Sequence, residues 1–140
     1  MVIKPKIAQF IFIVTLGFIA LPVLAHHSFA MFDREKNVTL MGEVKMLQWT
    51  NPHAWIQIIV TNEKGEQQEW SIECGSPNMM HRQGWKSTTI KPGEKVGMVI
   101  HPMRDGSPAG SLVSITLADG RILGAGGGPP PDTGNAPPPK

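Results

Sequence analysis

Five histidines give this chain most of its capacity to bind a metal ion: His26, His27, His53, His81 and His101. The first two stand together in "LPVLAHHSFAMFD", where an apolar N-terminal stretch gives way to a mixed one. If the chain is cleaved after Ala25, His26 becomes the first residue and carries a free amine beside its ring. Because one residue then offers two nitrogen ligands, this stretch predicts a metal chelate at the processed terminus.

Two sets of metal ligands are possible. In the first, His26 binds through its amine and ring, and His53 or His101 supplies another nitrogen. Such an all-nitrogen, roughly planar set suits Cu(II) better than the hard cations, which prefer oxygen. It resembles the histidine brace of certain periplasmic copper carriers and copper oxygenases, whose mature chains also begin with His. Only the terminal residue matches those families.

The second set uses two loops of the expected fold. His101 and Met103 lie two residues apart at one loop, and Trp49 and His53 flank a "TNP" turn at the other. Imidazole and thioether together suit Cu(I), and an indole face can lie over a cation. The pattern is similar to small periplasmic copper chaperones of OB fold, although their motif is not reproduced residue for residue.

Other interpretations stay open beside copper. The adjacent histidines can be the polar start of an exported chain, and His53 and His101 can be strand-edge residues bonded to loop backbone. A small-molecule or protein interaction module could use a face that includes Trp55 and Arg104. An accessory role to a periplasmic redox enzyme is a third interpretation.

The residue patterns of the common hydrolytic and phosphate-binding sites are missing. Glu69 and Glu73 would be about 13 Å apart on one extended strand, beyond the roughly 5–9.5 Å of a glycosidase pair. "RDGSPAG" lacks the Lys-Ser/Thr ending of a phosphate loop. No Ser-His-acid or Cys-His spacing appears, so we expect a binding protein rather than an enzyme.

The first 25 residues have the pattern of a secretory signal. A short basic start with Lys4 and Lys6 precedes an uncharged apolar run that ends in Val23 and Ala25, at the minus-three and minus-one positions of a cleavage site. An uncleaved membrane anchor is the alternative. Cleavage would place the protein in the periplasm or outside the cell, with no membrane attachment and with a metal ion, small ligand or periplasmic protein as partner.

Charge and cysteine content argue against a nucleic-acid-binding protein and against a disulfide-stabilised fold. The 13 Lys and Arg against 11 Asp and Glu become 11 against 11 once two signal lysines leave. A neutral chain lacks the basic stripe of a nucleic-acid binder. Cys74 is the single cysteine, so no internal disulfide can form and we expect a small, half-buried thiol.

Period-two alternation dominates the rest of the chain and predicts strands. The expected strands are 38–49, 53–61, 67–73, 96–101 and 111–117, with a short sixth at 121–123. Alternation places Val44, Met46 and Met98 on buried faces and leaves His53 and Glu73 facing solvent. Ser76 as a cap, Pro77 and a terminating Gly84 predict a helix of about two turns between the third and fourth strands.

The order β-β-β-α-β-β predicts an all-β fold with one short helix, an OB-like barrel of five to six strands. An open sandwich of the same strands is the rival. In such a barrel the loops that contain His53 and His101 border the same ligand-binding face. The expected organisation is a signal peptide at 1–25, one barrel domain at 26–123 and a disordered Gly/Pro-rich tail at 124–140.

Several segments together resemble a known family. "AHHSFAMFD", "WTNPHAWI", "EWSIECGSPNMMHRQGW", "IKPGEKV" and "HPMRDGSPAGSLVSITLADGRILG" are similar, in this order, to small secreted bacterial proteins labelled domain of unknown function 6152. The resemblance covers nearly all of residues 26–124. It implies export, a small β domain and a glycine where this chain has Cys74. It supplies no activity, substrate or catalytic residue.

Overall fold

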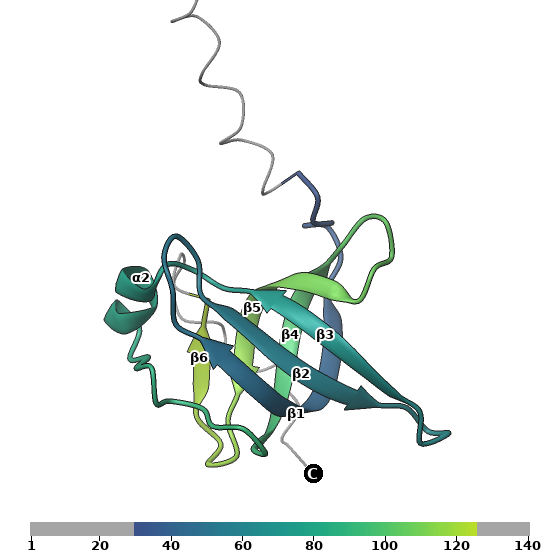
Figure 1. Ribbon diagram of the computed structural model, residues 1–140. Coiled ribbons are helices and arrows are strands. Elements are labelled where there is room, and N and C mark those ends of the chain that lie inside the picture. The colour runs from purple at the N-terminus through teal and green to yellow at the C-terminus, as the bar shows by residue number, and fades with distance from the viewer. Residues whose placement is uncertain (1–29, 126–140) are drawn as a thin grey trace, which may run out of the picture. The chain divides into compact units, whose positions relative to one another are not determined.

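The computed structural model describes residues 30–125 (Figure 1). The predicted signal peptide, His26 and His27 lie outside these residues, as does the tail beyond Ala125. No helix among residues 30–125 has the length and apolar character needed to cross a bilayer. The expected barrel domain lies almost entirely within the described range.

The elements follow the predicted order, and each agrees with its predicted range to within about two residues. They are β1 (Val38–Gln48), β2 (Trp55–Thr61), β3 (Gln67–Glu73), α2 (Pro77–Arg82), β4 (Lys95–Pro102), β5 (Ala109–Thr116) and β6 (Ile122–Gly124). The hydroxyl of Ser76 accepts a hydrogen bond from the amide of Met79, with Pro77 in the first turn. The capping signal in the sequence is therefore confirmed.

A parallel pairing closes the sheet into a barrel. The strands pair in the order β3-β2-β1-β4-β5-β6, and β3 also pairs with β5 through Ser71–Ala109, Ile72–Gly110 and Glu73–Ser111. The first five strands thus form a closed ring, and β6 is an extra strand beside β5. The predicted OB-like barrel is confirmed, and the open sandwich is wrong.

The barrel interior is filled by the alternating residues that the sequence pattern selects. Ile56, Ile58, Ile72, Ile100 and Ile115 are all fully buried. Because successive side chains of a strand point to opposite faces, their neighbours point outward. The core therefore fixes which residues reach the barrel surface.

One strand breaks the alternation. A bulge in β1 between Val44 and Met46 pairs Val44 with Ile58 but Met46 with Gln57. The extra residue reverses the faces that follow it, so Met46 is 41 % exposed while Leu47 and Trp49 pack against the core. The prediction that Met46 is buried is wrong for this reason.

The segment after α2 packs into the core and bonds to the end of β6. Trp85 is fully buried, and its indole N–H donates to the carbonyl of Gly124 at 2.8 Å. The amide of Gly75 donates to the carbonyl of Ala125 at 2.9 Å. These bonds extend the folded domain through Ala125, two residues past the predicted boundary at 123.

We expect Trp85→Phe to lower the free energy of unfolding by about 1–3 kcal/mol, because the substitution leaves the buried Gly124 carbonyl without its donor. Urea denaturation followed by circular dichroism measures the change. Trp70→Phe removes the same atoms from a partly exposed ring and is the matched control. Equal losses in the two variants would show that the hydrogen bond to β6 adds nothing.

Candidate functional site

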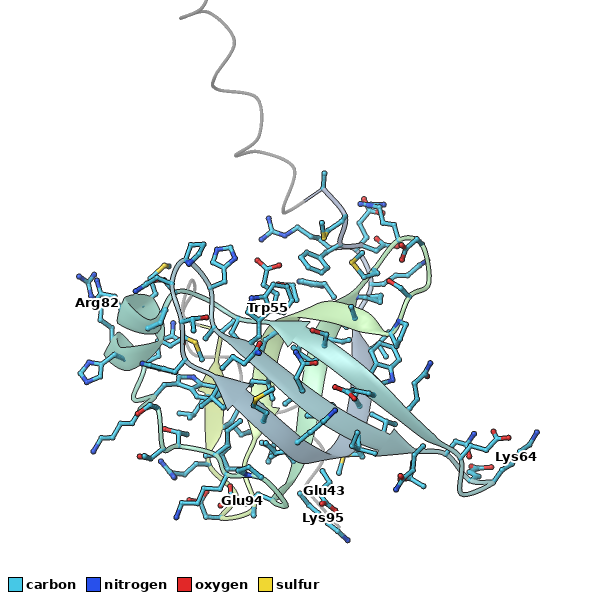
Figure 2. All side chains as sticks on the ribbon, viewed as in Figure 1. Glu43, Trp55, Lys64, Arg82, Glu94 and Lys95 are labelled. Atoms are coloured by element: carbon cyan, nitrogen blue, oxygen red, sulfur yellow. The ribbon has the colours of Figure 1, made fainter. Side chains whose placement is uncertain are left out.

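Four paired residues form a row along one end of the barrel. Trp55 of β2 lies opposite Glu73 of β3, Glu73 lies beside Ser111 of β5, and Ser111 lies opposite His101 of β4. Their neighbours along each strand are core residues, so the row points outward. We call it the rim row. Figure 2 shows Trp55 at the end of the barrel opposite Glu94 and Lys95, where β4 begins.

The rim row brings the two predicted loops to the same end of the barrel. The β1–β2 loop contains His53 and leads into Trp55, and the loop between β4 and β5 follows His101. This is the arrangement that the predicted fold requires of those loops. The structure therefore has both candidate imidazoles on one rim.

Glu73 is buried on this rim beside His53. Its carboxylate contacts the Nδ1 atom of His53, and the two side chains are 6 % and 29 % exposed. The prediction that Glu73 faces solvent is wrong. The hydrogen bonds between β2 and β3 continue past Trp55 to Ala54, and this keeps His53 beside the carboxylate. The amide of Ala54 donates to the Gly75 carbonyl, and the amide of Cys74 donates to the Ala54 carbonyl, which holds His53 over the carboxylate.

His101 is held in a similar way by a backbone oxygen. Its Nδ1 atom lies 2.9 Å from the carbonyl oxygen of Lys36. A carbonyl oxygen only accepts, so the ring donates through Nδ1, and in the neutral ring Nε2 has the lone pair. Metal-binding histidines usually donate their other ring N–H to a carboxylate or carbonyl. Both His53 and His101 have that second contact.

A short N-terminal arm, residues 32–36, is fastened beside His101. Phe32 is buried and forms a β-bridge with Met103. The amide of Asp33 donates to the Pro102 carbonyl at 2.8 Å. Figure 1 shows this start of the described chain beside the loop between β4 and β5.

The carboxylate of Asp33 strengthens the attachment. It lies 3.2 Å from the Lys36 ammonium and 3.8 Å from the Arg104 guanidinium. The hydrogen bond from Lys36 is the main cause that lowers the pKa of Asp33, and the charges of Lys36 and Arg104 add to it. A lowered pKa means that this stabilisation is lost only as the pH falls below the ordinary aspartate range. The Asp33 carboxylate is therefore charged at neutral pH, and its ion pairs with Lys36 and Arg104 are present there.

The described residues do not assemble a complete metal site. Three strand spacings separate Trp55 from His101 along the rim row, or about 14 Å. Within residues 30–125, no three His, Cys, Asp or Glu side chains are grouped to hold a metal ion. Any third donor must come from another residue type or from outside this range.

The other predicted site residues differ in their position and in their exposure to solvent. Met103 lies one residue past β4, at the bridge to Phe32. The Arg104 side chain is well exposed beside Asp33, and Trp55 is half-buried in the rim row. Trp49 packs against the core, so part of its surface already has apolar neighbours.

Cys74 is buried more completely than the half-buried thiol that the sequence predicted. Its thiol donates weakly to the carbonyl of Ile72. Burial is the main cause that raises its pKa, and the Glu73 charge adds to it. A buried thiol held in its neutral form is a poor metal ligand, because the thiolate is the form that binds.

We expect a double-mutant cycle of His53→Ala and Glu73→Ala to give a coupling energy of about 1–3 kcal/mol, because the contact is shielded from water. The measurement is the free energy of unfolding of the four proteins in urea.

The exposed pair Lys45 and Glu69, 2.6 Å apart, provides the control cycle. We expect less than about 1 kcal/mol there, since water screens exposed ion pairs. Equal couplings in the two cycles would contradict the special role of the buried carboxylate.

The chain matches a protein-family model. The model of a family described as a family of unknown function, DUF6152, covers residues 15–112, which is 98 of the 140 residues. The match ends at Leu112, so the last of the similar segments lies only partly within it. No curated protein matches the chain. The chain belongs to the DUF6152 family, whose function is unknown.

Proposed function

We propose that this chain is a small exported binding domain, without catalytic activity, that holds a copper ion at the rim beside His101. The observation that carries the proposal is the contact of His101 Nδ1 with the Lys36 carbonyl oxygen. This contact orients the ring and leaves Nε2 as the nitrogen that can ligate a metal.

The N-terminal arm supports His26 as the partner ligand. The arm is attached next to His101 through Phe32 and Asp33. Six residues of fully extended chain span about 20 Å, which limits how far His26 can lie from Phe32. If processing exposes the amine of His26, that residue offers two nitrogens within reach of the rim.

The remaining ligands determine which oxidation state is favoured. His53 is positioned by Glu73 on the same rim and would add a fourth nitrogen, a set that suits Cu(II). Met103 follows His101 by two residues and would add a thioether, which suits Cu(I). We propose Cu(II) as the resting state, because nitrogen ligands outnumber sulfur ligands in this arrangement.

Copper titration of the processed protein tests the proposal. Mass spectrometry first establishes that the exported chain begins at His26, and Cu(II) alone is then added under calorimetry. We expect one tight equivalent, with affinity about 10- to 100-fold lower after His101→Ala, as for the loss of one anchored ligand. One residue added before His26 should weaken binding similarly.

Two variants complete the experiment. His81→Ala removes an exposed imidazole on α2 and should leave the affinity unchanged. His53→Ala should weaken binding if the fourth nitrogen is used. An affinity for Cu(II) weaker than micromolar in the processed protein would overturn the proposal and favour an interaction surface around Trp55 and Arg104.

Copper affinity should fall as the medium is acidified through the range in which imidazoles become protonated. A metal binds only the neutral ring, so each protonation competes with copper. The lowered pKa of Asp33 keeps its carboxylate charged through the same range, so its ion pairs with Lys36 and Arg104 are not lost there. Titrations at several pH values measure it, and an unchanged affinity would exclude imidazole ligands.

A further inference from the structure

The N-terminal arm is joined to β4 on both sides of His101. On one side the amide of Asp33 donates to the carbonyl of Pro102 at 2.8 Å, and on the other Val38 of β1 is paired with Ile100. A regular antiparallel ladder would place one residue opposite His101, but here four residues, 34–37, lie between the two attachments. Extra residues in a ladder are common beside binding sites, where they redirect a group of the chain.

The extra residues form a turn that Asp33 closes twice. Its backbone carbonyl accepts a hydrogen bond from the amide of Lys36 at 3.1 Å. Its carboxylate accepts from the ammonium of Lys36 and also from the amide of Glu35, and these bonds lower the pKa of Asp33. An aspartate that accepts from the amide two residues ahead holds its own backbone in a turn.

This turn brings the Lys36 carbonyl to His101. The carbonyl oxygen lies 2.9 Å from the Nδ1 atom of the ring. Asp33 therefore connects two neighbouring points of β4, since its amide bonds to Pro102 and its turn ends on His101. The Asp33 side chain is 14 % exposed and that of Lys36 is 72 % exposed, so the carboxylate is the more firmly held of the two.

We propose that Asp33 is a positioning residue for His101, which it controls through the Lys36 carbonyl. By closing the turn, Asp33 keeps that carbonyl on Nδ1 and so keeps the proton of the neutral ring there. The lone pair is then on Nε2, the nitrogen that can ligate a metal. The consequence for copper rests on the proposed function, whereas the placement of the proton does not.

The proposal distinguishes the oxygen of Asp33 from its charge. Asparagine at this position has the same side-chain oxygen and can accept from the Glu35 amide, so it also closes the turn. It loses the ion pair with Lys36, which contributes little because the ammonium is well exposed. Alanine has no acceptor and leaves the turn open. Asp33→Asn should therefore behave as the wild type, and Asp33→Ala should not.

Nitrogen NMR of the imidazole rings tests the proposal on the metal-free exported protein. Spectra are taken near pH 8.5, where an unperturbed imidazole is neutral, and His101 is assigned by the signals that His101→Ala removes. We expect the proton of His101 on Nδ1 in the wild type and in Asp33→Asn. In Asp33→Ala we expect the Nε2-protonated form to appear as well. Asp33→Ser, with a shorter and weaker acceptor, should give less of it.

Asp119→Ala is the matched control. The Asp119 carboxylate accepts from the amide of Arg121 at 3.0 Å and from its Nε atom at 2.7 Å, which is the same local arrangement in the turn between β5 and β6. This variant should leave the His101 signals unchanged. A wild-type His101 with its proton on Nε2 would overturn the proposal. So would an unchanged His101 in a folded Asp33→Ala protein, or in Asp33→Ser if the alanine variant does not fold, because Asp33 would then only fasten the arm.

Cu(II) titration of the same proteins separates this proposal from the proposed function. We expect the affinity to fall about tenfold in Asp33→Ala, as for the loss of a group that orients a ligand, and to be retained in Asp33→Asn and Asp119→Ala. If the ring proton moves in Asp33→Ala but the wild type does not bind copper, the positioning role stands and the copper function fails. If the proton moves and the affinity is unchanged, His101 is not a ligand.

Discussion

The parallel pairing of β3 with β5 is the contact on which the rest of this molecule depends. It joins strands that are far apart in sequence through three residue pairs, and it converts a curved sheet into a closed barrel. Gly110, which pairs with Ile72 here, also lies close against β4, where a Cβ atom would lie 2.6 Å from Ile100 Cδ1 and 2.7 Å from the His101 carbonyl oxygen. The same pairing puts Glu73 next to Ser111 and so builds the rim row.

The rim row and its neighbour His53 include two imidazole rings whose orientations are fixed by polar contacts. Glu73 is almost fully buried beside His53, and His101 is tied to the backbone of the arm. Each ring is thus oriented by a group that belongs to a different part of the chain. Buried charged groups of this kind occur at many binding sites.

Much of this architecture could be predicted from the sequence, because its signals are local. Alternation located the strands, Ser76 and Pro77 located the helix, and the order of elements gave the barrel. The exposure of Met46 could not be predicted, since a bulge in β1 leaves no mark on the alternation that precedes it. The burial of Glu73 depends on the ladder that continues through Ala54, and the arm depends on contacts with a loop some seventy residues away.

The limited extent of the β3–β5 pairing leaves part of β3 with an open side. Gln67 to Trp70 pair with β2, but among residues 30–125 the pairing with β5 begins only at Ser71. A free strand edge can template the addition of another chain and lead to aggregation. Gln67, Gln68 and Glu69 are exposed there. A charged side chain at such an edge discourages this growth, and Glu69, paired with Lys45 of β1, supplies one here.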